Sequence, residues 1–276
     1  MRFSLRRRKF RPPLGAGRES VPDVVRRRGI YLLPNAFTTA ALFAGFYAIV
    51  QAMNQRFEVA AIAIFIAMVL DGMDGRVARL THTQSAFGEQ YDSLSDMTSF
   101  GVAPALVAYE WILRDLGRWG WGAAFLYCAG AALRLARFNA RLGVVDPRFF
   151  QGLPSPAAAA LVAGFVWLSV DNLFPMREAW MPWCAFAITV YAGLTMVSNA
   201  PFYSGKSFHL ARSVPFGVLI VFVLGIFVVS TNPPLALFGI SCAYALSGYL
   251  VWAWRWWRGE PNPVQTPPPG GGESGP

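Results

Sequence analysis

The chain has 276 residues, of which 55% are hydrophobic and only 14% are charged, and its formal net charge is +9. An ordinary soluble domain has roughly 25% charged residues, so the composition excludes such a domain and favours a chain that lies in lipid. Apolar stretches recur almost from end to end, and no hydrophilic block between them is long enough to fold alone. This organisation predicts one membrane domain.

The basic charge is concentrated before the first apolar stretch. Ten of the 24 Lys and Arg residues precede Gly29. We expect residues 1–28 to form a basic cytoplasmic tail, which anionic lipid headgroups attract. A nucleic-acid partner is not expected, because the sequence contains no visible module of that kind.

Eight apolar windows follow, each near the length of about 20 residues that a helix needs to cross a bilayer. In chain order they fall at 30–52, 57–75, 88–113, 119–140, 154–172, 179–198, 213–231 and 234–254. The predicted fold class is therefore all-α, a polytopic membrane bundle of about eight transmembrane helices within residues 29–258. Residues 259–276 are rich in Pro and Gly, cannot form a core, and are predicted to be a disordered tail.

The basic residues between the windows predict an orientation. If the N-terminus is cytoplasmic, all but four of the 24 Lys and Arg residues fall on the cytoplasmic side, and the exceptions are Arg56, Arg114, Arg118 and Arg177. This asymmetry satisfies the positive-inside rule. With an even number of spans, we expect both termini to be cytoplasmic in a multi-pass protein of the cytoplasmic membrane.

The segment between the second and third windows carries four aspartates. It reads Asp71-Gly-Met-Asp74-Gly75-Arg-Val-Ala78-Arg79, then eight residues, then Gly88, Asp92 and Asp96 at intervals of four. Residues three or four apart share one face of a helix, so each of the two helices has an acidic face. The short link over 80–87 makes the helices antiparallel neighbours, and their acidic faces can meet at the cytoplasmic side.

Four carboxylates grouped at the cytoplasmic side of two membrane helices need cations to offset their charge. An Asp at mid-membrane costs about 2.5 to 3.5 kcal/mol, and two carboxylates about 6 Å apart repel each other by roughly 3 kcal/mol at an effective dielectric constant of 20. Oxygen ligands without cysteine or clustered histidine suit magnesium, manganese or calcium rather than zinc. Two divalent ions would offset four carboxylates and would also hold a pyrophosphate.

Position for position, the segment is similar to the signature of the CDP-alcohol phosphotransferases, and all eight fixed positions are present. The resemblance implies that Asp71, Asp74 and Asp92 ligate two metal ions, Mg²⁺ or Mn²⁺. It further implies that Asp96 completes the metal site and serves as general base. The shared core of the family is six helices, so the last two windows are an extension, and the resemblance also implies a homodimer.

The same resemblance implies that Gly75, Ala78 and Arg79, together with Gly88, hold the cytidine diphosphate. The residue types suit this role, because Gly75 and Ala78 leave room for a nucleotide and Arg79 can donate to phosphate oxygens. Taken singly, each has a second explanation. A small residue in a membrane helix commonly serves packing, and an arginine at the interface commonly extends to the headgroups.

The signature does not select the acceptor alcohol, because enzymes with serine, glycerol-phosphate, inositol-phosphate and choline-type acceptors share it. Segments at 33–35, 92–104, 133–139, 152–156 and 196–199 resemble the branch of this family that uses serine. The resemblance implies that CDP-diacylglycerol and L-serine are the substrates and that phosphatidylserine and CMP are the products, a step of phospholipid biosynthesis.

Three residues at the end of the fourth window are candidates for binding serine. Arg134 and Arg137 are three apart near its cytoplasmic end, and Asn139 follows two residues later. A guanidinium in this place suits the carboxylate of serine. The two arginines are equally well explained as positive-inside anchors.

Two alternatives remain open at this point. The first keeps the reaction class and changes the acceptor to glycerol 3-phosphate or inositol phosphate. The second is a membrane cation transporter that uses the aspartates as its ion path. Transport would not explain the glycine, alanine and arginine residues at the signature spacings.

Overall fold

A computed structural model describes residues 21–81, 83, 85–140, 149–171, 179–203 and 216–259. The predicted tails therefore lie largely outside the described residues, because these omit 1–20 and 260–276. Five of the basic residues used to predict the orientation are outside them as well, namely Arg141, Arg148, Arg177, Lys206 and Arg212.

The described part of the chain is mostly helical, which confirms the all-α prediction. In chain order its helices are α1 (Val21–Met53), α2 (Phe57–Leu80), α3 (Ala86–Asp96), the π-helix η1 (Met97–Val102), α4 (Ala103–Trp111), the 3-10 helix η2 (Leu113–Leu116), α5 (Arg118–Ala140), α6 (Ser155–Val170), α7 (Met181–Val197), α8 (Phe216–Thr231) and α9 (Pro233–Trp257). Each of the eight apolar windows overlaps at least one of them. The third window comprises α3, η1 and α4 in direct succession.

Two stretches among the described residues are long and apolar enough to cross a membrane, Pro34–Met53 and Pro233–Trp257. Two shorter helices, α6 and α7, are also apolar. These findings fit a membrane protein, and the number of eight spans stays a prediction. The helix α1 begins at Val21, inside the segment predicted as a tail.

A small antiparallel ribbon was not predicted. Its strands, β1 (Phe149–Gln151) and β2 (Pro201–Tyr203), are three residues long, and Phe150 pairs with Phe202. Strands this short have no alternating pattern that a sequence would reveal. Gly152 follows β1 with a φ of +75°, which glycine adopts without a steric cost. This turn leads directly into α6.

Two clusters of buried apolar side chains hold the helices together. One lies between α1, α2, α4 and α6 and is rich in alanine, including the fully buried Ala48, Ala60 and Ala163. Such small side chains let helices approach closely in a membrane. The other cluster joins α4 through α7 to α9 and includes the fully buried Tyr127 and Phe202.

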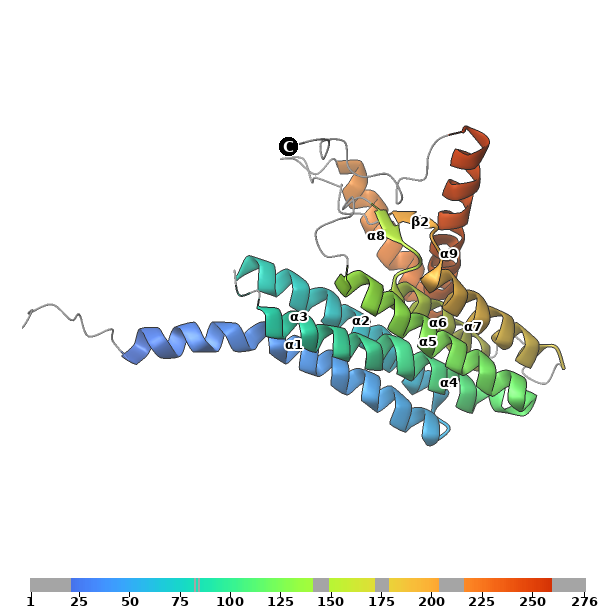
Figure 1. Ribbon diagram of the computed structural model, residues 1–276, viewed down its shortest axis with the longest axis horizontal. Coiled ribbons are helices and arrows are strands. Elements are labelled where there is room, and N and C mark those ends of the chain that lie inside the picture. The colour runs from blue at the N-terminus through green and yellow to red at the C-terminus, as the bar shows by residue number, and fades with distance from the viewer. Residues whose placement is uncertain are drawn as a thin grey trace, which may run out of the picture.

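The last two helices differ in direction from the rest. Figure 1 shows α8 and α9 inclined to the direction that α1, α2 and α5 share. The helix α9 contacts α6 and β2, and the Tyr191 hydroxyl of α7 donates to the Ala245 carbonyl of α9 over 2.8 Å. The helix α8 contacts α9, and it exposes large apolar side chains such as Leu224 and Phe227. An exposed apolar helix surface of this kind is typical of contact with lipid.

Candidate active site

Four aspartates meet where the C-terminal half of α2 lies beside α3. Asp71 and Asp74 are on α2, and Asp92 and Asp96 are on α3. Ligand oxygens of Asp71, Asp74 and Asp92 all lie within 4.8 Å of one another. Asp96 lies outside this group of three, one turn farther along α3, and its carboxyl group interacts with that of Asp71.

The three close carboxylates suit a divalent cation. Their mutual repulsion requires a positive charge between them, and a set of hard oxygen donors matches Mg²⁺ or Mn²⁺ rather than zinc. Asp74 is buried, and the Oδ1 atom of Asp92 is buried without a hydrogen-bond partner. An unpaired buried carboxylate oxygen in this position is the atom that a bound cation would satisfy.

Capping by Ser85 sets the start of α3 and therefore the position of its acidic stripe. The Ser85 side chain accepts a hydrogen bond from the Gly88 amide over 3.1 Å, which satisfies one of the free N–H groups of the first turn. Counting from this cap, Gly88, Asp92 and Asp96 recur at every fourth residue on one face of the helix. The N-terminal end of α3 also carries a partial positive charge, which favours anions beside it.

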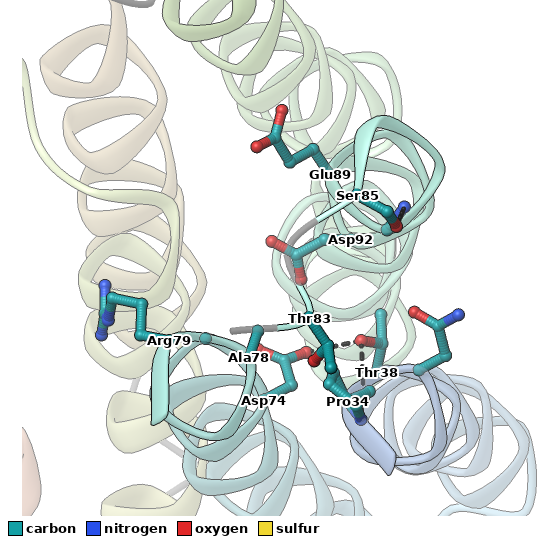
Figure 2. Close-up of a pocket in the computed structure, with 12 residues that line it drawn as sticks. Pro34, Thr38, Asp74, Ala78, Arg79, Thr83, Ser85, Glu89 and Asp92 are labelled. Atoms are coloured by element: carbon teal, nitrogen blue, oxygen red, sulfur yellow. Dashed lines mark hydrogen bonds between the residues drawn. The ribbon is translucent and has the colours of Figure 1, made fainter. Parts of the chain in front are cut away.

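A pocket with a volume of about 150 Å³ opens beside this cluster (Figure 2). Its lining comes from α1, α2, the link and α3, and consists of Pro34, Asn35, Thr38, Asp74, Gly75, Ala78, Arg79, Thr83, Ser85, Gly88, Glu89 and Asp92. All four residues predicted to hold the nucleotide belong to this lining. A Cβ atom built on Gly75 would meet no other atom within 4 Å, so the pocket side of α2 is open there. In Figure 2 the Arg79 guanidinium points away from Asp74 and Asp92.

The contribution of α1 to the site was missed by the sequence prediction. Asn35 and Thr38 line the pocket, and the Thr38 hydroxyl donates to Asp74 Oδ2 over 2.7 Å. The sequence does contain a signal for this role. Polar residues occupy the first turns of an apolar window at 30–52, one of them four residues after Pro34.

The helix α5 brings Arg134 to the Asp96 side of the cluster. The two side chains interact electrostatically. Arg134 Nη1 donates to Ser155 Oγ, at the first residue of α6, over 2.7 Å, whereas Arg134 Nε is buried without a hydrogen-bond partner. Two turns earlier on α5, the Tyr127 hydroxyl donates to the Phe100 carbonyl of η1 over 2.9 Å, which fixes α5 against the π-helix that follows Asp96.

The other two residues predicted to bind serine are engaged elsewhere. Arg137 Nη1 donates to the Val197 carbonyl at the end of α7 over 3.0 Å. Asn139 Nδ2 donates to Ser93 Oγ over 3.1 Å, next to Asp92 on α3. Arg134 is therefore the member of the three that keeps a buried donor beside Asp96.

Comparisons with known proteins identify the same family as the signature. Residues 31–191 match the model of the CDP-alcohol phosphatidyltransferase family. The chain is 37% identical over 223 residues to a CDP-diacylglycerol–serine O-phosphatidyltransferase of Helicobacter pylori (strain ATCC 700392 / 26695), covering 81% of this chain and 92% of the relative.

Relatives with the same name occur in other lineages. One from Mycobacterium leprae is 35% identical over 216 residues, covering 75% of this chain and 69% of the relative. One from Methanocaldococcus jannaschii is 36% identical over 160 residues, covering 57% of this chain and 71% of the relative.

Proposed function

The chain belongs to the CDP-alcohol phosphatidyltransferase family, and from that premise we propose that it transfers the phosphatidyl group of CDP-diacylglycerol to the hydroxyl group of L-serine. The products are phosphatidylserine and CMP. The observation that carries the proposal is a group of three carboxylates beside a pocket that the four non-acidic signature residues line. Relatives named for transfer to serine, which match over most of this chain, support serine as the acceptor.

In this proposal Asp71, Asp74 and Asp92 hold two divalent ions, Mg²⁺ or Mn²⁺. Asp96, which lies beside these three, is the fourth carboxylate of the metal site. Bound there, the ions supply positive charge that neutralises the pyrophosphate and stabilises the oxygens of the displacement. The small side chains of Gly75, Ala78 and Gly88 leave room for the cytidine diphosphate. Arg79 reaches its phosphates after its side chain turns toward the pocket.

Asp96 is proposed as the general base. Its carboxylate takes the hydroxyl proton of serine while the serine oxygen forms a bond to the lipid-side phosphorus. The bond between this phosphorus and the oxygen of CMP breaks, and CMP leaves. The carboxylates near the phosphorus are assigned to metal binding or to proton transfer, so both substrates react in one complex without a covalent enzyme intermediate.

Serine is held by its carboxylate at Arg134 in this proposal. Arg134 has a buried Nε without a hydrogen-bond partner, and its side chain interacts with Asp96. Serine bound through its carboxylate at Arg134 would therefore have its hydroxyl near the base. Asn139 and Arg137 belong to the same end of α5. The contact of Asn139 with α3 suits a role in shaping this subsite, whereas the contact of Arg137 ties this end of α5 to α7.

A serine-incorporation assay tests the proposal. Purified protein is supplied with CDP-diacylglycerol, Mg²⁺ or Mn²⁺ and radiolabelled L-serine, and we expect labelled phosphatidylserine and an equal amount of CMP. Efficient use of glycerol 3-phosphate or inositol phosphate with poor use of serine would mean that serine is not the acceptor, although the reaction class would be as proposed. Cation flux into vesicles without any CMP release would favour the transporter instead.

For the membrane arrangement we propose eight spans, one domain over residues 29–258, and a homodimer in the cytoplasmic membrane. Both termini, the link at 80–87 and the active site are cytoplasmic in this arrangement, in accordance with the distribution of basic residues. Bilayer lipids contact the exposed apolar surfaces of helices such as α8.

Cysteine labelling from outside intact cells is expected to leave the C-terminal tail unlabelled. Single cysteines are introduced at Ser274 and, as an externally exposed control, at Arg56, in a variant without Cys128, Cys184 and Cys242. An impermeant thiol reagent should modify the control position first, and Ser274 only after the cells are opened. Modification of the tail in intact cells would refute the even number of spans.

A further inference from the structure

Thr38 of α1 contacts both helices that carry the aspartates. Its hydroxyl donates to Asp74 Oδ2 of α2 over 2.7 Å, and its backbone carbonyl accepts a hydrogen bond from Ser95 Oγ of α3 over 3.1 Å. Ser95 directly precedes Asp96. We propose that Thr38 is a positioning residue that orients the Asp74 carboxylate for binding a divalent cation, an inference that rests on the proposed function.

The Thr38 hydroxyl has one proton and two acceptors within reach. Figure 2 shows dashed lines from Thr38 to Asp74 and to Pro34, and the distance to the Pro34 carbonyl is 3.2 Å, longer than the distance to the carboxylate. Hydrogen bonds to a charged acceptor are shorter and stronger than those to a neutral one. Thr38 is only 4% exposed, so little water competes for this proton. The Thr38 hydroxyl therefore donates its proton to the hydrogen bond with Asp74.

The backbone of α1 is held firmly at this level. One turn after the Ser95 contact, Ser99 Oγ donates to the Ala41 carbonyl over 3.1 Å. The two helices are also close at the next turn, where a Cβ atom on Gly45 would lie 2.5 Å from Ser99 Oγ. Because α1 is tied to α3 and η1 in this way, the Thr38 hydroxyl is a fixed donor for Asp74.

Such a donor affects the affinity of a metal site. A carboxylate ligand whose orientation is fixed by an outer hydrogen bond needs less reordering when the ion binds, and loss of such partners typically lowers metal affinity or activity by about 10- to 100-fold. Thr38 is not part of the eight-position signature, so its role does not follow from the family pattern.

The test is a Mn²⁺ titration of the purified full-length protein without substrates, in which free Mn²⁺ is measured by electron paramagnetic resonance. Thr38→Val keeps the side-chain shape and removes the hydroxyl, and we expect about 10- to 100-fold weaker Mn²⁺ binding. Thr38→Ser keeps the hydroxyl, and we expect its affinity to stay within about threefold of the unsubstituted protein.

Thr39→Val is the matched control. Thr39 is the next residue of α1, and its hydroxyl contacts the Tyr91 hydroxyl at 2.9 Å instead of a carboxylate. We expect unchanged Mn²⁺ affinity in this variant. In steady-state assays, Thr38→Val should need more Mn²⁺ for half-maximal activity than Thr39→Val does, with much of kcat restored at saturating Mn²⁺.

The outcomes separate this inference from the proposed function. Equal Mn²⁺ affinity in Thr38→Val and the unsubstituted protein would overturn the role of Thr38 and leave the metal site intact, whereas no Mn²⁺ binding by the unsubstituted protein would overturn the metal site itself. If Thr38→Val does not fold, Thr38→Ala replaces it with the same expectation. If Thr38→Ser bound Mn²⁺ as weakly as Thr38→Ala does, this result would also contradict the role of the hydroxyl.

Discussion

Asp96→Asn is expected to lower kcat for phosphatidyl transfer by about 10²- to 10⁴-fold, the range that a positioned general base contributes. Asparagine has nearly the same size and cannot take the serine proton. Because Asp96 lies outside the group of three close carboxylates, Mn²⁺ affinity and the KM for CDP-diacylglycerol should change much less than kcat. Steady-state kinetics and a Mn²⁺ titration of the same preparation measure both effects.

The three other aspartates should give the opposite pattern. Asn at Asp71, Asp74 or Asp92 removes a charged ligand, so Mn²⁺ and nucleotide-lipid binding should weaken together. Asp115→Asn is the matched control, because Asp115 is an exposed aspartate in η2, which follows the C-terminal end of α4. Full activity in any of the four cluster variants would remove the role proposed for that residue, and loss of Mn²⁺ binding in Asp96→Asn would make Asp96 chiefly a ligand.

The sequence predicted the aspartate cluster well, because its geometry depends on local helix periodicity and one short link. Spacings of three and four place the carboxylates on one face of each helix, and the link at 80–87 brings those faces together. The same reasoning located the helical segments, since length and hydropathy determine where a helix can cross lipid.

Features that depend on contacts between distant segments were harder to predict. Thr38 contacts Asp74, which lies 36 positions later in the chain. No local sequence pattern predicts such a contact. The π-helix η1 interrupts an apolar window, and its Phe100 carbonyl accepts a hydrogen bond from Tyr127 of α5. The residues predicted to bind serine, Arg134, Arg137 and Asn139, all lie near one end of α5. Only the residues that they contact on α3, α6 and α7 distinguish their roles.

Arg134→Ala is expected to raise the KM for serine by about 10- to 150-fold, since a hydrogen bond to a charged group contributes about 1.5 to 3 kcal/mol. The KM for CDP-diacylglycerol should change little. Arg137→Ala is the control on the same helix, because its guanidinium donates to the Val197 carbonyl, and we expect it to reduce thermal stability without a selective effect on serine.

The choice between serine and ethanolamine isolates the carboxylate contact from any general damage to the site. Ethanolamine has the hydroxyl and the ammonium group of serine and lacks the carboxylate, so a site built around Arg134 would leave the buried guanidinium unpaired and reject it. Arg134 also interacts with Asp96, and its loss should therefore lower kcat for both acceptors. The ratio of their kcat/KM values cancels this shared effect, and it should fall toward one in Arg134→Ala while staying high in Arg137→Ala. An unchanged ratio in Arg134→Ala would show that the acceptor carboxylate binds elsewhere, and the contacts of Asn139 with α3 would then make that residue the next to vary.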